Sequence, residues 1–232
     1  MKKALLLSSS GYKDTGYLRH AKNLIKDFLS EAYKEEILFV PYAGVLKDFD
    51  EYEQKVKDRL KTKSVRSIHH YEDKKSAIKN AKTIIVGGGN SFVLLDALYR
   101  FDLVEVLQEA LLESGAFYVG WSAGANIAGH SIMTTNDMPI IMPNSFKALG
   151  IFPHQINPHF VSGKIPNGGE SREERLAEFL EINQNLAVFA LPEGSGIKIL
   201  GGEAEVIGYE NIYKFEYKKE IETLNLGTKF KV

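Results

Sequence analysis

Short apolar runs alternate along the chain with longer stretches in which apolar residues recur at helical spacing. The apolar runs are Ala4–Leu7, Ile37–Val40, Val65–Ile68, Thr83–Val86, Phe117–Val119 and Ala187–Leu191. The helical stretches lie around residues 18–28, 49–61, 77–81 and 92–112. Parallel strands need crossover connections, and near-continuous apolar strands are typical of a sheet covered on both faces. The pattern therefore predicts an α/β fold with a doubly wound, mostly parallel sheet and helices on both faces.

The pattern changes after about residue 195, where the helical stretches stop. Gly196–Leu200, Glu203–Gly208 and Ile212–Tyr217 follow one another with strand-like alternation. We expect them to form antiparallel C-terminal strands at one edge of the sheet. No internal repeat or linker divides the chain, so its length predicts a single α/β domain over residues 1–232. Ser162–Gly169, which is rich in Gly, Pro and Asn, is expected to be an exposed loop.

Composition narrows the class of protein. Apolar residues make up 44% and charged residues 25%, and the formal net charge is −1 with no basic block, which disfavours a nucleic-acid partner. No apolar run approaches the roughly 20 residues that cross a membrane, and Ala4–Leu7 is too short for the core of a signal peptide. The absence of cysteine excludes thiolate catalysis and cysteine-ligated zinc. We expect a cytoplasmic protein with no membrane partner, acting as a monomer or homodimer.

The first feature that carries chemistry is the turn Gly120-Trp121-Ser122-Ala123-Gly124. It follows the strand Phe117–Val119 and precedes the small-residue run Ala125–Gly129. A nucleophilic serine is often held in such a strand–turn–helix context, with glycines where the tight turn leaves no room for side chains. A chance match of common small residues is the alternative interpretation, and the flanking elements favour the functional one. We therefore predict that Ser122 is a nucleophile.

A second turn, Gly87-Gly88-Gly89-Asn90, directly follows the strand Thr83–Val86. Successive glycine amides at the end of a parallel strand can face an anion without obstruction. The spacing matches neither the dinucleotide-binding nor the Walker phosphate motif. It fits an oxyanion hole formed by amides near Gly88, Gly89 and Ala123, with Asn90 as a substrate-binding candidate. A glycine turn that serves packing alone is the alternative.

A serine nucleophile needs a general base, usually a histidine, and a group that orients the base. The six histidines are His20, His69, His70, His130, His154 and His159. We expect the first three to lie at the surface. His159 stands in Ile156-Asn157-Pro158-His159-Phe160, a stiffened turn after a short apolar segment, and it is the favoured base. Isolated histidines are often structural, so the other histidines stay open on this reasoning alone.

Two acids compete for the orienting role. Glu193 directly follows the buried strand Ala187–Leu191 within Leu191-Pro192-Glu193-Gly194. Asp137 lies in Thr134-Thr135-Asn136-Asp137-Met138-Pro139. Both are also ordinary turn residues. The strand-end position places Glu193 slightly ahead, and both acids are retained.

Arg172 stands at the start of a predicted helix. Ser171 and Glu174 fit a capping box, which puts Arg172 in the first helical turn, where the helix dipole disfavours a cation. A substrate carboxylate would offset this, because guanidinium groups bind carboxylates through two hydrogen bonds. A salt bridge to Glu170 or Glu173 is the simpler interpretation, and the residues by themselves favour it.

Together these segments resemble the peptidase E family. The matching blocks run in order along nearly the whole chain. They are Pro41-Tyr42-Ala43-Gly44-Val45, Ile85-Val86-Gly87-Gly88-Gly89-Asn90, Gly120-Trp121-Ser122-Ala123-Gly124-Ala125-Asn126, Thr134-Thr135-Asn136-Asp137-Met138-Pro139, Ile156-Asn157-Pro158-His159-Phe160, Glu170-Ser171-Arg172-Glu173 and Leu191-Pro192-Glu193-Gly194. No single block is specific, but the set is.

The resemblance implies a cytoplasmic serine peptidase, an α-aspartyl dipeptidase with a class I glutamine amidotransferase-like fold. It implies that Ser122 is the nucleophile and His159 the base, and that Arg172 pairs with the aspartate side chain of a small peptide substrate. Glu193 and Asp137 both match positions of the third triad member. Such a mechanism requires neither a metal ion nor an organic cofactor, so we expect none.

Three other functions compete with this one. In an α/β-hydrolase esterase the histidine usually lies late in the chain, whereas no histidine follows His159 here. A cyanophycinase-like peptidase that cleaves β-aspartyl bonds could use the same machinery. A non-catalytic ligand-binding module of this fold is disfavoured, since the serine, the histidine and both acids are present.

Overall fold

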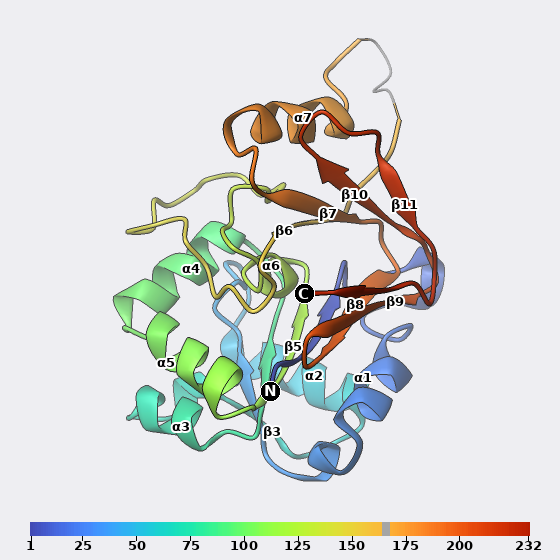
Figure 1. Ribbon diagram of the computed structural model, residues 1–232. Helices are drawn as coiled ribbons and strands as arrows, with labels where there is room; N and C mark the ends of the chain where they lie inside the picture. The colour runs from blue at the N-terminus through green and yellow to red at the C-terminus, as the bar shows by residue number, and fades with distance from the viewer. Residues whose placement is uncertain (164–167) are drawn as a thin grey trace.

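The computed structural model describes residues 1–163 and 168–232, so part of the predicted loop Ser162–Gly169 lies outside the described residues. Its main sheet has eight strands in the order β12-β9-β8-β1-β5-β4-β2-β3 (Figure 1). The strands are β1 (Lys3–Leu7), β2 (Ile37–Val40), β3 (Val65–Ser67), β4 (Thr83–Val86), β5 (Phe117–Trp121), β8 (Ser195–Leu200), β9 (Glu203–Gly208) and β12 (Lys229–Lys231). The pairs from β1 to β3 are parallel, and those from β1 to β12 are antiparallel.

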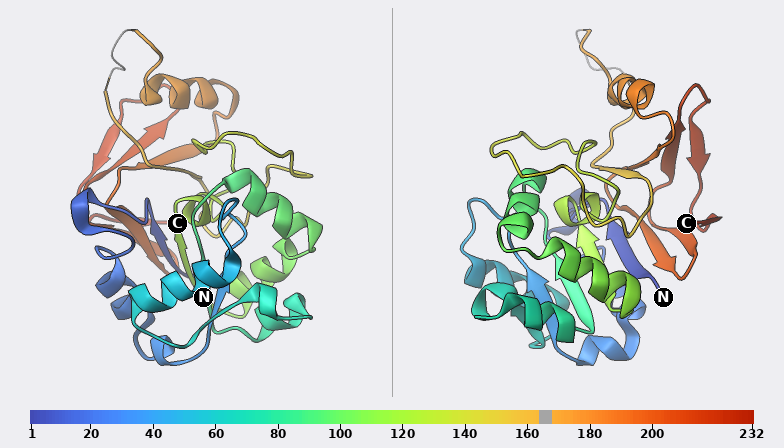
Figure 2. Two further views of the ribbon diagram at one scale, coloured as in Figure 1. Left: turned by 180° about the vertical axis from the view of Figure 1, so that it is seen from behind. Right: turned by 60° about the vertical axis from the view of Figure 1, so that its left-hand side comes forward.

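Helices cover both faces of this sheet because alternate strand residues point to opposite sides. Leu5 and Leu7 share a core with α1 (Lys22–Leu29) and α2 (Phe49–Leu60). Ala4 and Leu6 share the other core with three further helices, which lie across the sheet from α1 (Figure 2). These are α3 (Lys74–Asn80), α4 (Ser91–Arg100) and α5 (Val104–Gln108), the last continued by a π-helical turn, Glu109–Glu113. Short 3₁₀ turns occupy Lys13–Thr15, Ser30–Lys34 and Ile68–His70. The predicted doubly wound α/β fold is confirmed.

A smaller sheet stands above the carboxyl ends of the parallel strands, with the order β11-β10-β7-β6 (Figure 1). Its strands are β6 (Gln155–Pro158), β7 (Ala187–Leu191), β10 (Ile212–Glu216) and β11 (Glu222–Leu224). Helix α7 (Arg172–Ile182) packs Leu176 and Leu180 on its outer face. The inner face, with Ile156 and Phe189, belongs to the same core as Ala4 and Leu6. The two sheets therefore share one hydrophobic core.

The smaller sheet changes the expected place of one C-terminal strand. Gly196–Leu200 and Glu203–Gly208 do pair antiparallel beside β1, as β8 and β9. The third segment pairs instead with β7 and β11 as β10. Alternation along a strand reports that one face is buried, but not which strand is its neighbour, so this pairing was not readable from the pattern. Strand β12 takes the place beside β9.

Within the described ranges, no helix combines the length and the apolar composition that crossing a membrane requires.

Candidate active site

Ser122 lies at the junction of β5 and the short helix α6 (Ala123–Asn126), which ends earlier than the small-residue run predicted. Its backbone has φ 55° and ψ −116°, a strained conformation for a residue other than glycine. A Cβ on Gly120 would lie 2.3 Å from the Gly124 carbonyl oxygen, and one on Gly124 would lie 2.3 Å from that of Val86. Both glycines are therefore required by the close packing of the turn against α6 and β4.

His159 and Glu193 reach Ser122 from the smaller sheet. His159 directly follows β6, and its Nε2 lies 2.9 Å from Ser122 Oγ. Its Nδ1 lies 2.9 Å from Oε1 of Glu193, which follows β7. The carboxylate selects the tautomer in which Nδ1–H donates to Glu193 and Nε2 accepts the serine proton. The side chains of His159 and Glu193 are 39% and 53% exposed, so the pair orients the ring rather than acting as a buried ion pair.

The carboxyl end of β1 connects these three residues through backbone groups. The Leu7 carbonyl accepts a hydrogen bond from Ser122 N at 3.0 Å. The buried Ser8 Oγ accepts from His159 N at 3.0 Å and donates to the Leu191 carbonyl at 2.7 Å. Ser8 N donates to the Ser195 carbonyl at 3.0 Å. Sequence reasoning missed Ser8, and its position after a central strand was the only signal that could have pointed to it.

The glycine turn after β4 lies against the serine. A Cβ on Gly88 would lie 2.9 Å from Ser122 Cβ, and one on Gly89, whose φ is 149°, would lie 2.0 Å from the Ala43 carbonyl oxygen. Tyr52 of α2, a residue that sequence reasoning also missed, donates its hydroxyl to the Gly88 carbonyl at 2.9 Å. Among the described residues, the amides of Gly88 and Gly89 have no hydrogen-bond partner. These donors are free for an anion beside Ser122.

Asp137 and Asn90 fasten the start of α4. Asp137 Oδ2 accepts from Ser91 N at 2.7 Å and from the Thr135 hydroxyl at 3.1 Å. Asn90 caps α4 through Oδ1 and donates from Nδ2 to the Met138 carbonyl at 2.8 Å. The acid in contact with His159 is therefore Glu193, whereas Asp137 and Asn90 bind backbone groups behind the glycine turn.

Arg172 is the first residue of α7, and the predicted capping box of Ser171 and Glu174 is present. Neither Glu170 nor Glu173, the two acids that sequence suggested as salt-bridge partners, pairs with Arg172. Glu170 pairs with Arg175 at 3.7 Å, and Glu173 accepts from Ser162 Oγ and Gly163 N. Partial burial, and then the charge of Arg175, lower the pKa of Arg172. In the described part of the chain, no carboxylate lies within ion-pair distance of Arg172.

The expected surface position of His20 is wrong. His20 is only 8% exposed, with the rings of Tyr12 and Tyr209 at centroid distances of 5.9 and 6.4 Å. Tyr209 comes from a distant part of the chain, so local sequence could not reveal the burial. Burial lowers the pKa of His20, and the charge of Glu193 partly opposes this. His130 is exposed and His154 is half-buried; neither contacts Ser122.

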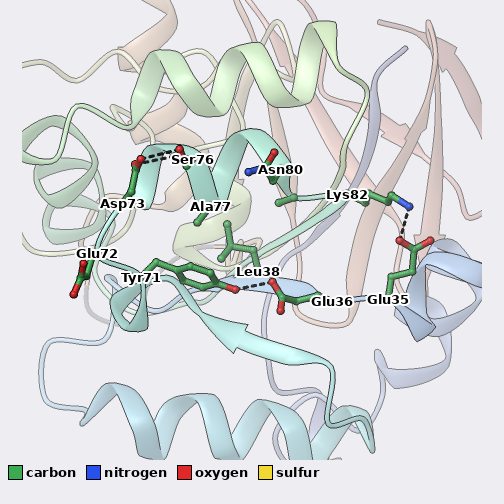
Figure 3. A pocket seen from close by; sticks show the side chains of 11 residues that line it. Glu35, Glu36, Leu38, Tyr71, Glu72, Asp73, Ser76, Ala77, Asn80 and Lys82 are labelled. Carbon is green, nitrogen blue, oxygen red and sulfur yellow. Dashed lines mark hydrogen bonds and ion pairs between the residues drawn. The ribbon is translucent and has the colours of Figure 1, made fainter.

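A separate hollow of about 410 Å³ opens at the amino ends of the parallel strands β2 and β4 (Figure 3). Its lining includes Glu36 and Lys82, which precede β2 and β4. Four of its polar groups form two pairs: Tyr71 donates to Glu36 at 2.6 Å, and Lys82 lies 2.7 Å from Glu35. Because Ser122 lies at the carboxyl ends of the parallel strands, this hollow is not part of the serine site.

Comparison with known proteins places the chain in a family. The model of peptidase family S51 matches residues 4–207. The chain is 49% identical over 233 residues to peptidase E of Haemophilus influenzae (strain PittGG), with 99% of each chain covered. It is 48% identical to peptidase E of Actinobacillus pleuropneumoniae serotype 5b (strain L20), again with 99% of each chain covered. The crystal structure of a peptidase from an acI-B1 actinobacterium shares the fold, with a TM-score of 0.66 at 18% identity, covering 100% of this chain and 97% of the other.

The matched range contains all three residues of the Ser122, His159 and Glu193 relay. Two relatives that cover almost the whole chain carry the same name. The chain therefore belongs to peptidase family S51, and it is a serine peptidase.

Proposed function

We propose that this serine peptidase hydrolyses dipeptides with an N-terminal aspartate, through an acyl-enzyme on Ser122. The observation that carries the proposal is the relay from Ser122 Oγ through His159 to Glu193, with 2.9 Å at each step. The peptidase E name of the relatives supports the reaction class. The guanidinium of Arg172, which has no carboxylate partner among the described residues, supports an acidic substrate.

In this mechanism His159 Nε2 takes the proton of Ser122 as Oγ attacks the carbonyl carbon of the peptide bond. The tetrahedral intermediate collapses, the C–N bond breaks, and His159 gives that proton to the leaving amine. Water then attacks the aspartyl ester, again with His159 as base, and Ser122 recovers its proton. Glu193 keeps the ring oriented and stabilises its protonated form.

The oxyanion that forms in each step is assigned to the amides of Gly88, Gly89 and Ala123. Amide donors held in place before the reaction stabilise developing charge without reorganisation. Asp137 and Asn90 are assigned to holding this turn, through their bonds to the start of α4 and to Met138. In this assignment they support the site and do not touch the substrate.

The nucleophile is tested with a serine-directed fluorophosphonate probe and with Asp-Leu hydrolysis. We expect the wild-type protein to be labelled at Ser122 and Ser122→Ala to lose hydrolysis by at least about 10⁴-fold. A folded wild-type protein that is never labelled would indicate a ligand-binding module. Near wild-type turnover by Ser122→Ala would overturn the assignment.

The substrate is tested with a panel of Asp-Leu, Glu-Leu, β-Asp-Leu and Ala-Leu. Removal of a charge-assisted contact in Arg172→Ala should lower kcat/KM for Asp-Leu by about 10- to 100-fold and leave Ala-Leu unchanged. Arg175→Ala is the matched control, since Arg175 lies on the same helix and already pairs with Glu170. Equal losses on both substrates would remove Arg172 from substrate recognition. Preference for β-Asp-Leu would instead indicate a cyanophycinase-like reaction.

A further inference from the structure

Two histidines and a carboxylate converge after β3, which is three strands from β5 in the main sheet. Asp50 lies in the first turn of α2, and His69 and His70 lie in the 3₁₀ turn after β3. Asp50 Oδ1 is 3.0 Å from His69 Nε2 and 3.1 Å from His70 Nε2. One ligand atom from each residue lies within 4.8 Å of the others, a grouping found once in the described part of the chain.

These spacings resemble those between ligands of a bound metal ion. Zinc binds imidazole nitrogen and carboxylate oxygen at about 2.0–2.2 Å, which places two tetrahedral ligands about 3.3–3.5 Å apart. The observed contacts would need to open by only a few tenths of an ångström. The centroids of the two imidazole rings lie 3.9 Å apart, and the ring planes are inclined at 38°. Both rings direct Nε2 to the same carboxylate oxygen of Asp50.

The surroundings supply the second set of contacts that metal-binding histidines use. His69 Nδ1 lies 2.6 Å from the buried Ser67 Oγ, so donation from Nδ1–H leaves the Nε2 lone pair available. Glu53 is 6% exposed, accepts from Ser67 N at 2.6 Å and places Oε2 3.1 Å from His70 Nε2. Lys57 binds the other Glu53 oxygen, which holds this carboxylate in place.

One imidazole nitrogen of this cluster faces two carboxylates at once. His70 Nε2 can offer one proton, yet it faces oxygens of both Asp50 and Glu53 at 3.1 Å. A divalent ion would bind both imidazoles and offset the charge of Asp50, whose ion-pair partners among the described residues are these two histidines. We propose that Asp50, His69 and His70 bind a divalent first-row transition ion such as Zn²⁺, with Glu53 or water completing the coordination. The ion ties the start of α2 to the turn after β3 and takes no part in the serine chemistry.

The test uses the full chain after removal of metal with a chelator, titrated with ZnCl₂ in a calorimeter. We expect one ion per chain. Asp50→Asn, His69→Gln and His70→Gln should each weaken binding by at least about tenfold. Asp58→Asn on the same helix and His130→Gln at an exposed position should keep wild-type affinity. Saturating Zn²⁺ should raise Tm in the wild-type protein and leave Tm unchanged in His69→Gln, because a ligand stabilises the state it binds.

Ser122→Ala must bind Zn²⁺ as tightly as the wild-type protein, since the proposed site is separate from the serine. Affinity that is equal in the wild-type protein and the three ligand variants would overturn the proposal. So would binding that is lost in His159→Gln and kept in His69→Gln, because the ion would then occupy the serine site. The circular dichroism spectrum of each variant separates loss of binding from loss of folding.

Discussion

At the scale of single residues, the serine site concentrates backbone strain where its reacting atoms meet. Ser122 and His159 have φ of 55° and 53°, and such conformations cost on the order of 1–3 kcal/mol each. Each residue directly follows a strand, one in the main sheet and one in the smaller sheet, and the sharp turns direct the two side chains toward each other. The bonds from Ser122 N to Leu7 and from His159 N to Ser8 hold these turns.

Gly88 offers a direct test of close packing at the site. An added Cβ would lie 2.9 Å from Ser122 Cβ and 3.0 Å from Trp121, so Gly88→Ala must displace either the glycine turn or the serine. We expect kcat/KM to fall by at least about 10²-fold, the size of effect seen when an oxyanion donor is lost. Gly202→Ala is the control, because its nearest neighbour would be 3.8 Å away and activity should be unchanged. The measurement is steady-state kinetics. A wild-type kcat/KM in Gly88→Ala would contradict the close packing of Gly88 against Ser122.

His20 predicts a pH dependence of stability. Burial lowers its pKa in the folded protein, against about 6.5 in an unfolded chain, so the unfolded state binds the proton more readily. Its contribution to stability is therefore full above about pH 6.5 and declines as the pH falls towards the folded pKa, with a slope of at most about 1.4 kcal/mol per pH unit. Urea unfolding at pH 7.5 and 5.5 should show a smaller decline for His20→Gln than for the wild-type protein. Equal declines would show that His20 does not titrate differently on folding.

Sequence alone pointed to some of the candidate site residues more strongly than to others. Ser122 and His159 stood out because each follows an apolar run in a turn with little conformational freedom. Sequence placed Glu193 only slightly ahead of Asp137, since each is an acid in a turn and only the pairing of β6 with β7 brings Glu193 beside His159. Deciding between them required contacts between residues far apart in the chain.

At the scale of elements, the end of β1 predicts a positioning role for Ser8. In Ser8→Ala the His159 N–H loses its acceptor, and the Leu191 carbonyl loses a donor. We expect kcat to fall by roughly 10- to 100-fold, in line with the loss of a buried hydrogen bond that orients the base, with KM little changed.

Ser131→Ala is the matched control for Ser8→Ala. Ser131 is also buried and accepts from Gln155 of β6 at 2.7 Å, but it makes no contact with His159. Both variants should lose thermal stability to a similar extent. If kcat is unchanged in Ser8→Ala while Tm falls as in Ser131→Ala, Ser8 is a structural residue only.

Elements were predictable where the chain signals them locally. The buried strands β1, β2, β4 and β5 are continuous apolar runs, and the start of α7 carries its own capping box. The smaller sheet was not predictable, because β7 resembles any buried strand and β10 resembles an edge strand. The smaller sheet is distinguished from the main one by the packing of Phe160 and Phe215 under α7, which depends on tertiary contacts.

At the scale of the whole molecule, the serine site depends on two sheets that share one core. Ala4, Leu6, Ile156 and Phe189 belong to the same cluster. We therefore propose that residues 1–232 form a single domain, which should unfold in one step. Trp121, the only tryptophan, is fully buried in β5 beside Ser122 and reports on the main sheet, whereas activity needs both sheets.

We expect the urea midpoints of Trp121 fluorescence, far-ultraviolet circular dichroism and residual activity to coincide. Activity that disappears at a lower urea concentration than the fluorescence change would show that the smaller sheet opens independently. In that case the chain would comprise two cooperative units.

The central position of β1 has a consequence for synthesis of the protein. The strand is synthesised before both of its neighbours, because Lys3 pairs with Phe117 on one side and with Leu200 on the other. Pairings so distant in the chain form late and slow folding. Ser8 binds backbone groups of His159, Leu191 and Ser195, so a nascent chain cannot assemble the proposed site until residue 195 has emerged. We therefore expect peptide cleavage to begin only after these distant segments have paired.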